Sequence, residues 1–242
     1  MKTPSRQALV TGANRGIGLE FIRQLLAHGD RVVATCREPG KAAVLNTLAG
    51  EHPGRLHVLP LDVSEPKAHA QLARELPLVL GESDGQGAGQ LDLLVNNAGV
   101  LHAGERFGAL GAAHLEHSFR VNAMGPLLLS QALAPLLADG ARIANLSSQL
   151  GSIGNLGRFG TPSYNISKAA QNMVTALLAS ALSERDIVVL ALHPGWVRTQ
   201  MGGEDAEITP QEAVAGLLET IDAATAPMSG GFYDWKGEPM PW

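Results

Sequence analysis

The stretch that decides the fold reads ALVTGANRGIGLEFIRQLLAHG and covers residues 8–29. The apolar residues 8–10 predict a short strand, and the apolar periodicity of residues 19–27 predicts a helix that ends at His28-Gly29. Between them lies a glycine-rich turn, residues 11–18. Backbone N–H groups at the start of a helix, together with the helix dipole, can bind a pyrophosphate there.

The glycines of this turn depart from the usual dinucleotide pattern, which is G-x-G-x-x-G. Here Gly12, Gly16 and Gly18 form G-x-x-x-G-x-G. The order of strand, glycine turn and helix is what makes them informative, and it predicts a cofactor site.

Beyond the turn, strands and helices alternate along the whole chain. Further strands are predicted at residues 31–36, 55–63, 91–95, 142–146, 187–192 and 231–235, and helices at 65–80, 112–138 and 212–223. Another helix carries residues 164 and 168 and continues to about residue 184. The polar, glycine-rich residues 81–90 indicate a surface loop. Right-handed crossovers turn this alternation into an α/β Rossmann-type, doubly wound parallel sheet in three layers, with its ligand at the carboxyl ends of the strands.

Length and composition agree with one such domain. The 242 residues are 45% hydrophobic, which is enough for one large core spanning 1–242, with a cofactor half at about 1–140 and a catalytic and substrate half at about 141–242. The net charge of −5 offers no basic face for nucleic acid. No apolar run reaches membrane-spanning length, and the polar residues 1–7 do not read as a signal peptide. Cys36 is the single cysteine, which excludes an internal disulfide and a cysteine-rich metal site, so a reducing cytoplasm is expected.

The end of the second strand indicates which cofactor is bound. An acidic residue there takes the ribose 2′-hydroxyl of NAD(H), whereas an arginine accommodates the 2′-phosphate of NADP(H). Cys36 holds the acidic place and Arg37 follows, while Arg15 lies in the glycine turn. Two guanidiniums can flank one phosphate, so we expect NADP(H) rather than NAD(H). Glu38 is the competing residue, because it could turn back to the ribose.

Polar side chains follow the next two strands. Asp62, after the third strand, could meet an adenine amino group or cap the following helix. Asn96-Asn97-Ala98-Gly99, after the fourth, can hold strand ends together and let a flat ligand lie close to the backbone. Asn122 lies in the long helix near Gly125-Pro126, where a bend is expected. There it is either a functional group or a satisfied polar residue.

Tyr164 and Lys168 form the candidate catalytic pair. Four residues apart on a helix, they share one face. A lysine near a phenol favours the phenolate and lowers a pKa that starts near 10. The alternative is an exposed Tyr/Lys pair. Ser147 and Ser148 stand at the end of the fifth strand.

These motifs together resemble those of the short-chain dehydrogenase/reductase family, over roughly residues 7–233. The matching residues are Thr11-Gly-x-x-x-Gly-x-Gly18, Asp62, Asn96-Asn-Ala-Gly99, Asn122, Ser148, Tyr164-x-x-x-Lys168, Pro194-Gly195 and Thr199. Within the family, residues 147–153, 194–199 and 232–237 look like the branch of C-factor and the sniffer-like carbonyl reductases.

The resemblance implies hydride transfer between NADP(H) and a carbonyl or alcohol. The implied catalytic residues are Asn122, Ser148, Tyr164 and Lys168. The implied cofactor contacts are Gly12, Asn14, Arg15, Gly16, Ile17, Gly18, Arg37, Asp62, Val63, Asn96, Ala98, Gly99, Tyr164, Lys168, Pro194, Gly195, Val197 and Thr199. Ser148 and Tyr164 are separated by more residues than in typical members. The extra residues fall in 153–162, which can bulge outward, and Ser152 is therefore a second candidate for the serine.

The substrate, partners and possible alternatives are less strongly indicated. His102, Phe159, Trp196 and Met201 lie on loops and suggest a partly apolar mouth for a small-molecule substrate, or else simple packing. His114 and His117 are interpreted as part of a solvated helix face, so no metal is expected. His193 is interpreted as a structural residue. Relatives are commonly dimers or tetramers, so a homo-oligomer is expected. The competing functions are an NADP(H)-binding regulator without turnover and an epimerase or dehydratase, for which the chain is short.

Overall fold

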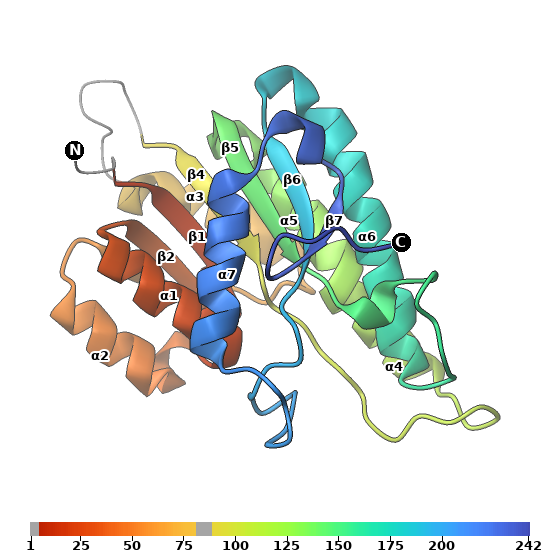
Figure 1. Cartoon of the computed structure of the whole chain (residues 1–242). Coiled ribbons are helices and arrows are strands. Elements are labelled where there is room, and N and C mark those ends of the chain that lie inside the picture. The colour runs from red at the N-terminus through yellow and green to blue at the C-terminus, as the bar shows by residue number, and fades with distance from the viewer. Residues whose placement is uncertain (1–4, 81–88) are drawn as a thin grey trace.

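A parallel sheet of seven strands forms the centre of the computed structural model, which describes residues 5–80 and 89–242 (Figure 1). The strand order is β3-β2-β1-β4-β5-β6-β7, and every neighbouring pair is parallel. The strands are β1 Gln7–Thr11, β2 Arg31–Cys36, β3 Leu56–Pro60, β4 Leu91–Asn96, β5 Leu137–Leu146, β6 Val188–His193 and β7 Phe232–Asp234. The order reverses between β1 and β4, and ligands of such sheets bind at this switch point. The predicted fold class is confirmed.

Helices cover both faces of the sheet (Figure 1). They are α1 Gly16–His28, α2 Ala43–Glu51, α3 Pro66–Val79, α4 Ala112–Phe119, α5 Gly125–Leu133, α6 Pro162–Leu182 and α7 Pro210–Ala223. One apolar cluster joins the sheet to α1, α2 and α7, and a second joins it to α3, α5 and α6. The central strands are apolar on both sides because both sides are covered. Leu9 and Leu94, for example, are fully buried.

The predicted helix over residues 112–138 is wrong in two respects. It is interrupted by η2, a π-helical turn at Arg120–Met124, just before Gly125-Pro126, where the bend was expected. It also ends early, because η3, a 3-10 turn at Ala134–Leu136, contains a proline, which removes a helical N–H. Strand β5 therefore begins at Leu137 rather than at residue 142. It pairs first with Leu91 and then shifts register.

Other boundaries differ by smaller amounts. Helix α2 was not predicted, and β3 ends at Pro60 rather than at residue 63. Residues 81–88 of the expected surface loop and 1–4 of the polar N-terminus lie outside the described residues. None of the described helices combines the length and apolarity needed to cross a bilayer.

Candidate active site

Tyr164 and Lys168 lie in the first turns of α6, close to the carboxyl ends of β4 and β5. The Lys168 Nζ is 5.6 Å from the centroid of the Tyr164 ring, so the two side chains do share a face. Only 8% of Tyr164 and 3% of Lys168 are exposed. The alternative of an exposed surface pair is therefore wrong.

Lys168 is held by two acceptors. Its Nζ donates to the backbone oxygen of Leu146 at 2.6 Å and to Gln171 Oε1 at 2.8 Å. Burial lowers the pKa of Lys168 to about 7. The ammonium thus points toward the end of β5 and retains one further N–H donor, since a lysine has three.

The electrostatics of Tyr164 differ from the simple expectation. Burial raises the pKa of its phenol to about 12, and a hydrogen bond with Ser148 opposes that rise only in part. The expectation that the lysine lowers this pKa is wrong in this geometry, because the Lys168 Nζ donates its hydrogen bonds to Leu146 and Gln171 and none to the phenol oxygen.

The structure distinguishes the three serines. Ser147 Oγ donates to Asn172 Oδ1 at 2.5 Å and is fully buried under α6. Ser152 Oγ donates to the Pro241 carbonyl at 2.7 Å and accepts from Asn155 N. Ser148 is the one whose side chain interacts with the Tyr164 phenol and lowers its pKa. The geometry therefore favours Ser148 over Ser152.

The long segment between Ser148 and Tyr164 projects outward. After η4, a 3-10 turn at Gln149–Gly151, the side chains of Ile153 and Leu156 are 76% and 64% exposed. The extra residues therefore do not separate Ser148 from Tyr164.

Asn122 sits in the π-helical turn and is fully buried. Its Oδ1 accepts from Val100 N, and its Nδ2 donates to the Val100 oxygen and to Ser167 Oγ, all at 2.9 Å. The side chain thus ties the segment after β4 to α6. Any role toward a ligand or water would fall to its backbone.

The glycine turn packs closely against the segment after β4. A Cβ on Gly12 would lie 2.9 Å from Ala98 Cα, and one on Gly18 would lie 2.5 Å from both Asn97 Nδ2 and the Gly12 oxygen. Helix α1 begins there with no side-chain cap and no acidic residue in its first turn. Its N-terminal N–H groups therefore lack a side-chain acceptor, which suits a pyrophosphate.

Charged residues flank this turn. Arg15 Nη1 donates to Gln200 Oε1 at 2.6 Å, so Arg15 connects the turn to the segment after β6. Arg37 is exposed at the end of β2. Glu38 pairs with Lys41 at 2.6 Å, and both side chains are largely exposed, so the Glu38 carboxylate already has a cationic partner.

Asp62 lies at the same edge of the sheet. Its Oδ1 accepts from Ser64 N at 2.9 Å and from Ser64 Oγ at 2.7 Å. Burial raises its pKa, but these hydrogen bonds and the charges of Arg37 and His117 outweigh burial and leave the pKa below its ordinary value. The N-cap of α3 is Glu65, so Asp62 is not that cap.

The two asparagines after β4 have structural partners. Asn96 Nδ2 donates to Asn145 Oδ1 at 2.8 Å and to Ser130 Oγ at 3.3 Å, so its side chain points into the protein. Asn97 Nδ2 donates to the Thr11 oxygen at 2.8 Å and holds the glycine turn. Asn96 can therefore meet a ligand only through its backbone.

The remaining cofactor candidates lie around the same edge. A Cβ on Gly99 would lie within 4 Å of Asn122 Oδ1 and Lys168 Nζ, and one on Gly16 would lie 3.4 Å from Thr199 Cγ2. The segment after β6 thus meets the glycine turn. Asn14, Ile17, Val63, Ala98, Pro194, Gly195 and Val197 belong to these same segments.

The four substrate candidates fall into two groups. His102 stacks on His114 with ring centroids 4.0 Å apart, and half-exposed Phe159 meets the exposed Phe107 edge-on at 5.6 Å. Trp196 and Met201, on the segment after β6, are about half exposed. Trp196 Nε1 donates to the Gly202 oxygen at 2.7 Å. Across residues 5–80 and 89–242, no three His, Cys, Asp or Glu side chains converge closely enough to hold a metal ion.

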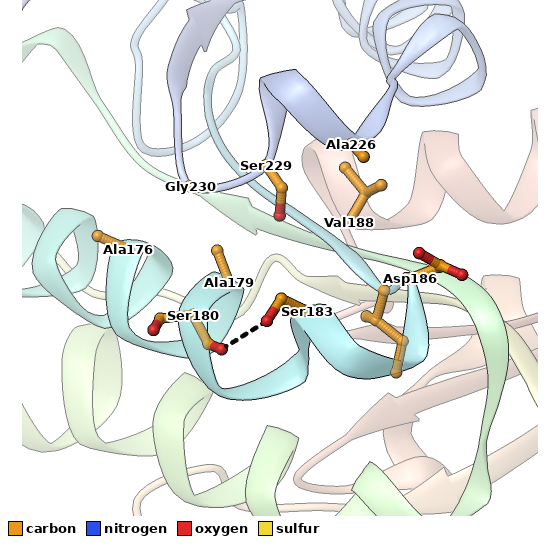
Figure 2. Close-up of a pocket in the computed structure, with 10 residues that line it drawn as sticks. Ala176, Ala179, Ser180, Ser183, Asp186, Val188, Ala226, Ser229 and Gly230 are labelled. Atoms are coloured by element: carbon orange, nitrogen blue, oxygen red, sulfur yellow. Dashed lines mark hydrogen bonds between the residues drawn. The ribbon is translucent and has the colours of Figure 1, made fainter.

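A separate cavity of about 450 Å³ lies at the other end of α6 (Figure 2). Ala179, Ser180, Ser183 and Ser229 line it, and Ser183 Oγ donates to the Ser180 oxygen. The end of α6 is 18 residues from Tyr164, or roughly 27 Å along a helix. This cavity is therefore not part of the candidate active site.

Two residues near the pair were missed from the sequence. Gln171 is one helical turn beyond Lys168, a spacing that could have revealed it. Glu105 Oε2 accepts from Ser163, beside Tyr164, across 58 residues of chain, and no sequence pattern indicated that contact.

Comparison with known proteins agrees with this geometry. A family model described as short chain dehydrogenase matches residues 6–209. C-signal of Myxococcus xanthus is 38% identical over 156 residues, covering 64% of this chain and 94% of that protein. The 1-hydroxy-2-glutathionyl-2-methyl-3-butene dehydrogenase of Rhodococcus sp. (strain AD45) is 34% identical, covering 97% of this chain and 98% of that one.

Solved structures give the same result. The NADPH-bound carbonyl reductase from chicken fatty liver is 38% identical, with a TM-score of 0.91 and coverage of 99% of this chain and 100% of that one. The carbonyl reductase Sniffer of D. melanogaster is 31% identical, with a TM-score of 0.91 and coverage of 98% and 100%. The expected resemblance to C-factor and sniffer-like proteins is confirmed. The chain therefore belongs to the short-chain dehydrogenase/reductase family, which is a family of oxidoreductases.

Proposed function

We propose that this protein is an NADP(H)-dependent oxidoreductase that interconverts a carbonyl and an alcohol. The observation that carries the proposal is the buried Tyr164 phenol, whose pKa the Ser148 side chain lowers, with the ammonium of Lys168 lying over the same ring one turn further along α6. When bound, NADPH would supply the hydride that is added to the carbonyl carbon, and in the reverse direction NADP⁺ would accept the hydride that leaves the alcohol carbon.

In the direction of reduction, Tyr164 donates its phenolic proton to the carbonyl oxygen. A buried phenol with a pKa of about 12 keeps this proton at neutral pH, so it is available to the substrate. Ser148 Oγ hydrogen-bonds the same oxygen and stabilises the negative charge that develops on it. In the reverse direction the phenolate must form, and a cation close to the oxygen favours that.

We assign this role to Lys168, whose Nζ lies over the Tyr164 ring, 5.6 Å from its centroid. The role requires the ammonium to turn from Leu146 and Gln171 toward the phenol oxygen during the reaction. Because Lys168 is buried, its charge interacts with neighbouring groups more strongly than it would in water. Its one remaining N–H donor suits a ribose hydroxyl, and its contact with Leu146 fixes it at the end of β5. The backbone of Asn122 would hold a water that connects Lys168 with solvent, because the Asn122 side chain is already engaged.

NADP(H) is preferred over NAD(H) because of the charges at the end of β2. Arg37 is exposed there, no acidic side chain occupies the place held by Cys36, and Glu38 is paired with Lys41. The similarity to an NADPH-bound carbonyl reductase supports this choice. The half-exposed Trp196, Met201 and Phe159 favour a partly apolar carbonyl substrate.

Self-association is part of the same proposal. Ile166, Met173 and Leu177 follow one another on α6 at spacings of seven and four residues and are 55–60% exposed. This is an apolar stripe with no partner in the described part of the chain. A second copy of the chain would cover it, which light scattering on the wild type and on Met173→Glu can test.

The function itself is tested by NADPH consumption with a panel of aldehydes, ketones and quinones. Tyr164→Phe should reduce turnover by roughly 10²–10⁴-fold while NADPH still binds. Tyr233→Phe is the matched control, because Tyr233 is the other tyrosine of the chain and its hydroxyl only reaches the Met228 oxygen. A Tyr164→Phe variant with near-normal turnover would exclude the proposed acid.

Tight NADPH binding without turnover of any compound in the panel would instead favour the regulatory alternative. Turnover that does not change the redox state of the cofactor would favour an epimerase or dehydratase.

A further inference from the structure

The N-terminus of α6, which carries Tyr164, has no cap of its own. Its N-cap residue Thr161 has left-handed backbone angles and makes no capping hydrogen bond, and the first turn contains no acidic residue. Thr161 Oγ1 bonds with Asn165 Oδ1 instead. The N–H groups at such an end need acceptors from elsewhere.

Glu105 provides that acceptor from a distant segment. Its Oε2 accepts from Ser163 N at 3.1 Å and from Ser163 Oγ at 2.8 Å. Its side chain is only 3% exposed. A carboxylate at a helix N-terminus satisfies a backbone donor and is also favoured by the helix dipole.

The same contact connects three elements. Ser118 Oγ, on α4, donates to Ser163 Oγ at 3.2 Å, so Ser118, Ser163 and Glu105 form a continuous chain of hydrogen bonds. The segment that contains Glu105 is also held at Val100 by Asn122. Residues 100–105 are therefore fastened at both ends to the helices that surround the candidate active site.

We propose that Glu105 is a positioning residue for the proton donor: it caps α6 across the fold and thereby sets the place of Tyr164, which directly follows Ser163. The proposal rests on the proposed function, since it is the acid role of Tyr164 that makes the position of α6 matter. Small displacements of a reacting group can reduce the rate by roughly 10²-fold. Glu105 itself need not touch the substrate.

The test combines kinetics with amide hydrogen exchange on Glu105→Ala, Glu105→Gln and Ser163→Ala. Glu105→Ala should speed exchange of the Ser163–Asn165 amides by roughly 3- to 30-fold, and the second half of α6 should be unchanged. It should lower kcat roughly tenfold or more, while the Kd for NADPH stays within about twofold. Glu105→Gln keeps one acceptor oxygen and should fall between Glu105→Ala and the wild type in both measurements.

Glu116→Gln is the matched control, because Glu116 is an exposed acid on α4 whose side chain makes no hydrogen bond to α6. Ser163→Ala removes the hydroxyl bond to Glu105 but keeps the backbone N–H bond, so its effect on exchange should be smaller than that of Glu105→Ala. In the Glu105→Ala background it should add only the loss of the Ser118 bond, because the hydroxyl bond to Glu105 is already absent. If Glu105→Ala does not fold, Glu105→Gln and Ser163→Ala carry the test.

The outcomes separate this proposal from the proposed function. Unchanged exchange at Ser163 in Glu105→Ala and Glu105→Gln would overturn the cap, whether or not the enzyme is active. Faster exchange with unchanged kcat would overturn the positioning role. A wild type that turns over no carbonyl would overturn the function on which the positioning role rests, while exchange would still decide the cap.

Discussion

Gln171 Oε1 accepts a hydrogen bond of 2.8 Å from Lys168 Nζ, and both residues are buried in α6. Burial favours the neutral amine and lowers the pKa of Lys168 to about 7, whereas an acceptor for its N–H groups favours the charged form. Gln171 therefore helps keep Lys168 protonated at the pH where it would act.

Gln171→Leu should lower the pKa of Lys168 further. If activity requires the protonated lysine, the loss of activity at rising pH should then begin at a lower pH than in the wild type. A hydrogen bond to a charged group contributes about 1.5–3 kcal/mol, so a decrease in kcat/KM of roughly tenfold at pH 7 is expected. The pH profile of kcat/KM measures both.

Gln171→Glu is the opposing variant, because a carboxylate next to Lys168 should raise the lysine pKa and move the same limb to higher pH. Identical profiles for Gln171→Leu and the wild type would show that this contact does not tune Lys168.

Gly18→Ala should disrupt the cofactor turn. The new Cβ would lie 2.5 Å from the Gly12 oxygen, which is backbone and cannot move aside cheaply. Overpacking of this kind costs about 1–3 kcal/mol, so both Tm and NADPH affinity should fall. Gly50→Ala in α2 is the control, because nothing lies within 4 Å of its Cβ position; it should be neutral or slightly stabilising.

Arg37→Ala should weaken binding of NADPH and leave binding of NADH nearly unchanged. The loss of a charge-assisted contact to a 2′-phosphate corresponds to roughly 10- to 100-fold in Kd. Arg31→Ala is a matched control, since Arg31 is exposed at the opposite end of the same strand, β2. Equal effects of Arg37→Ala on both cofactors, measured by titration of cofactor fluorescence, would contradict the assignment.

His193 should make the protein less stable in acid. Burial lowers the pKa of His193 to about 4, while an unfolded histidine titrates near 6.5. Between these values the unfolded chain binds more protons, so stability falls as pH falls from about 6.5 to about 4, by about 3 kcal/mol in total. Urea unfolding across this range measures the loss. This loss of stability should be smaller in His193→Asn. It should be unchanged in His28→Gln, because His28 is exposed.

The local sequence was sufficient to predict the regular helices and strands. The strand, turn and helix of residues 8–29, and the pairing of Tyr164 with Lys168, depend on the spacing of nearby residues, and spacing is visible in a sequence. Where a proline or a π-helical turn interrupts a helix, as between Phe119 and Leu137, the boundary depends on backbone hydrogen bonds that compete with one another. Those boundaries were predicted least well.

By itself, the sequence determined the fold class and the set of residues around the candidate active site, because hydrophobic alternation and strand ends are properties of the chain. Only the tertiary structure decided how these residues are used. It separated Ser148 from Ser147 and Ser152, directed Lys168 to Leu146 and Gln171, and brought Glu105 to the end of α6. These choices depend on burial and on hydrogen-bond partners far apart in the chain, which become neighbours only when the sheet and its helices have packed.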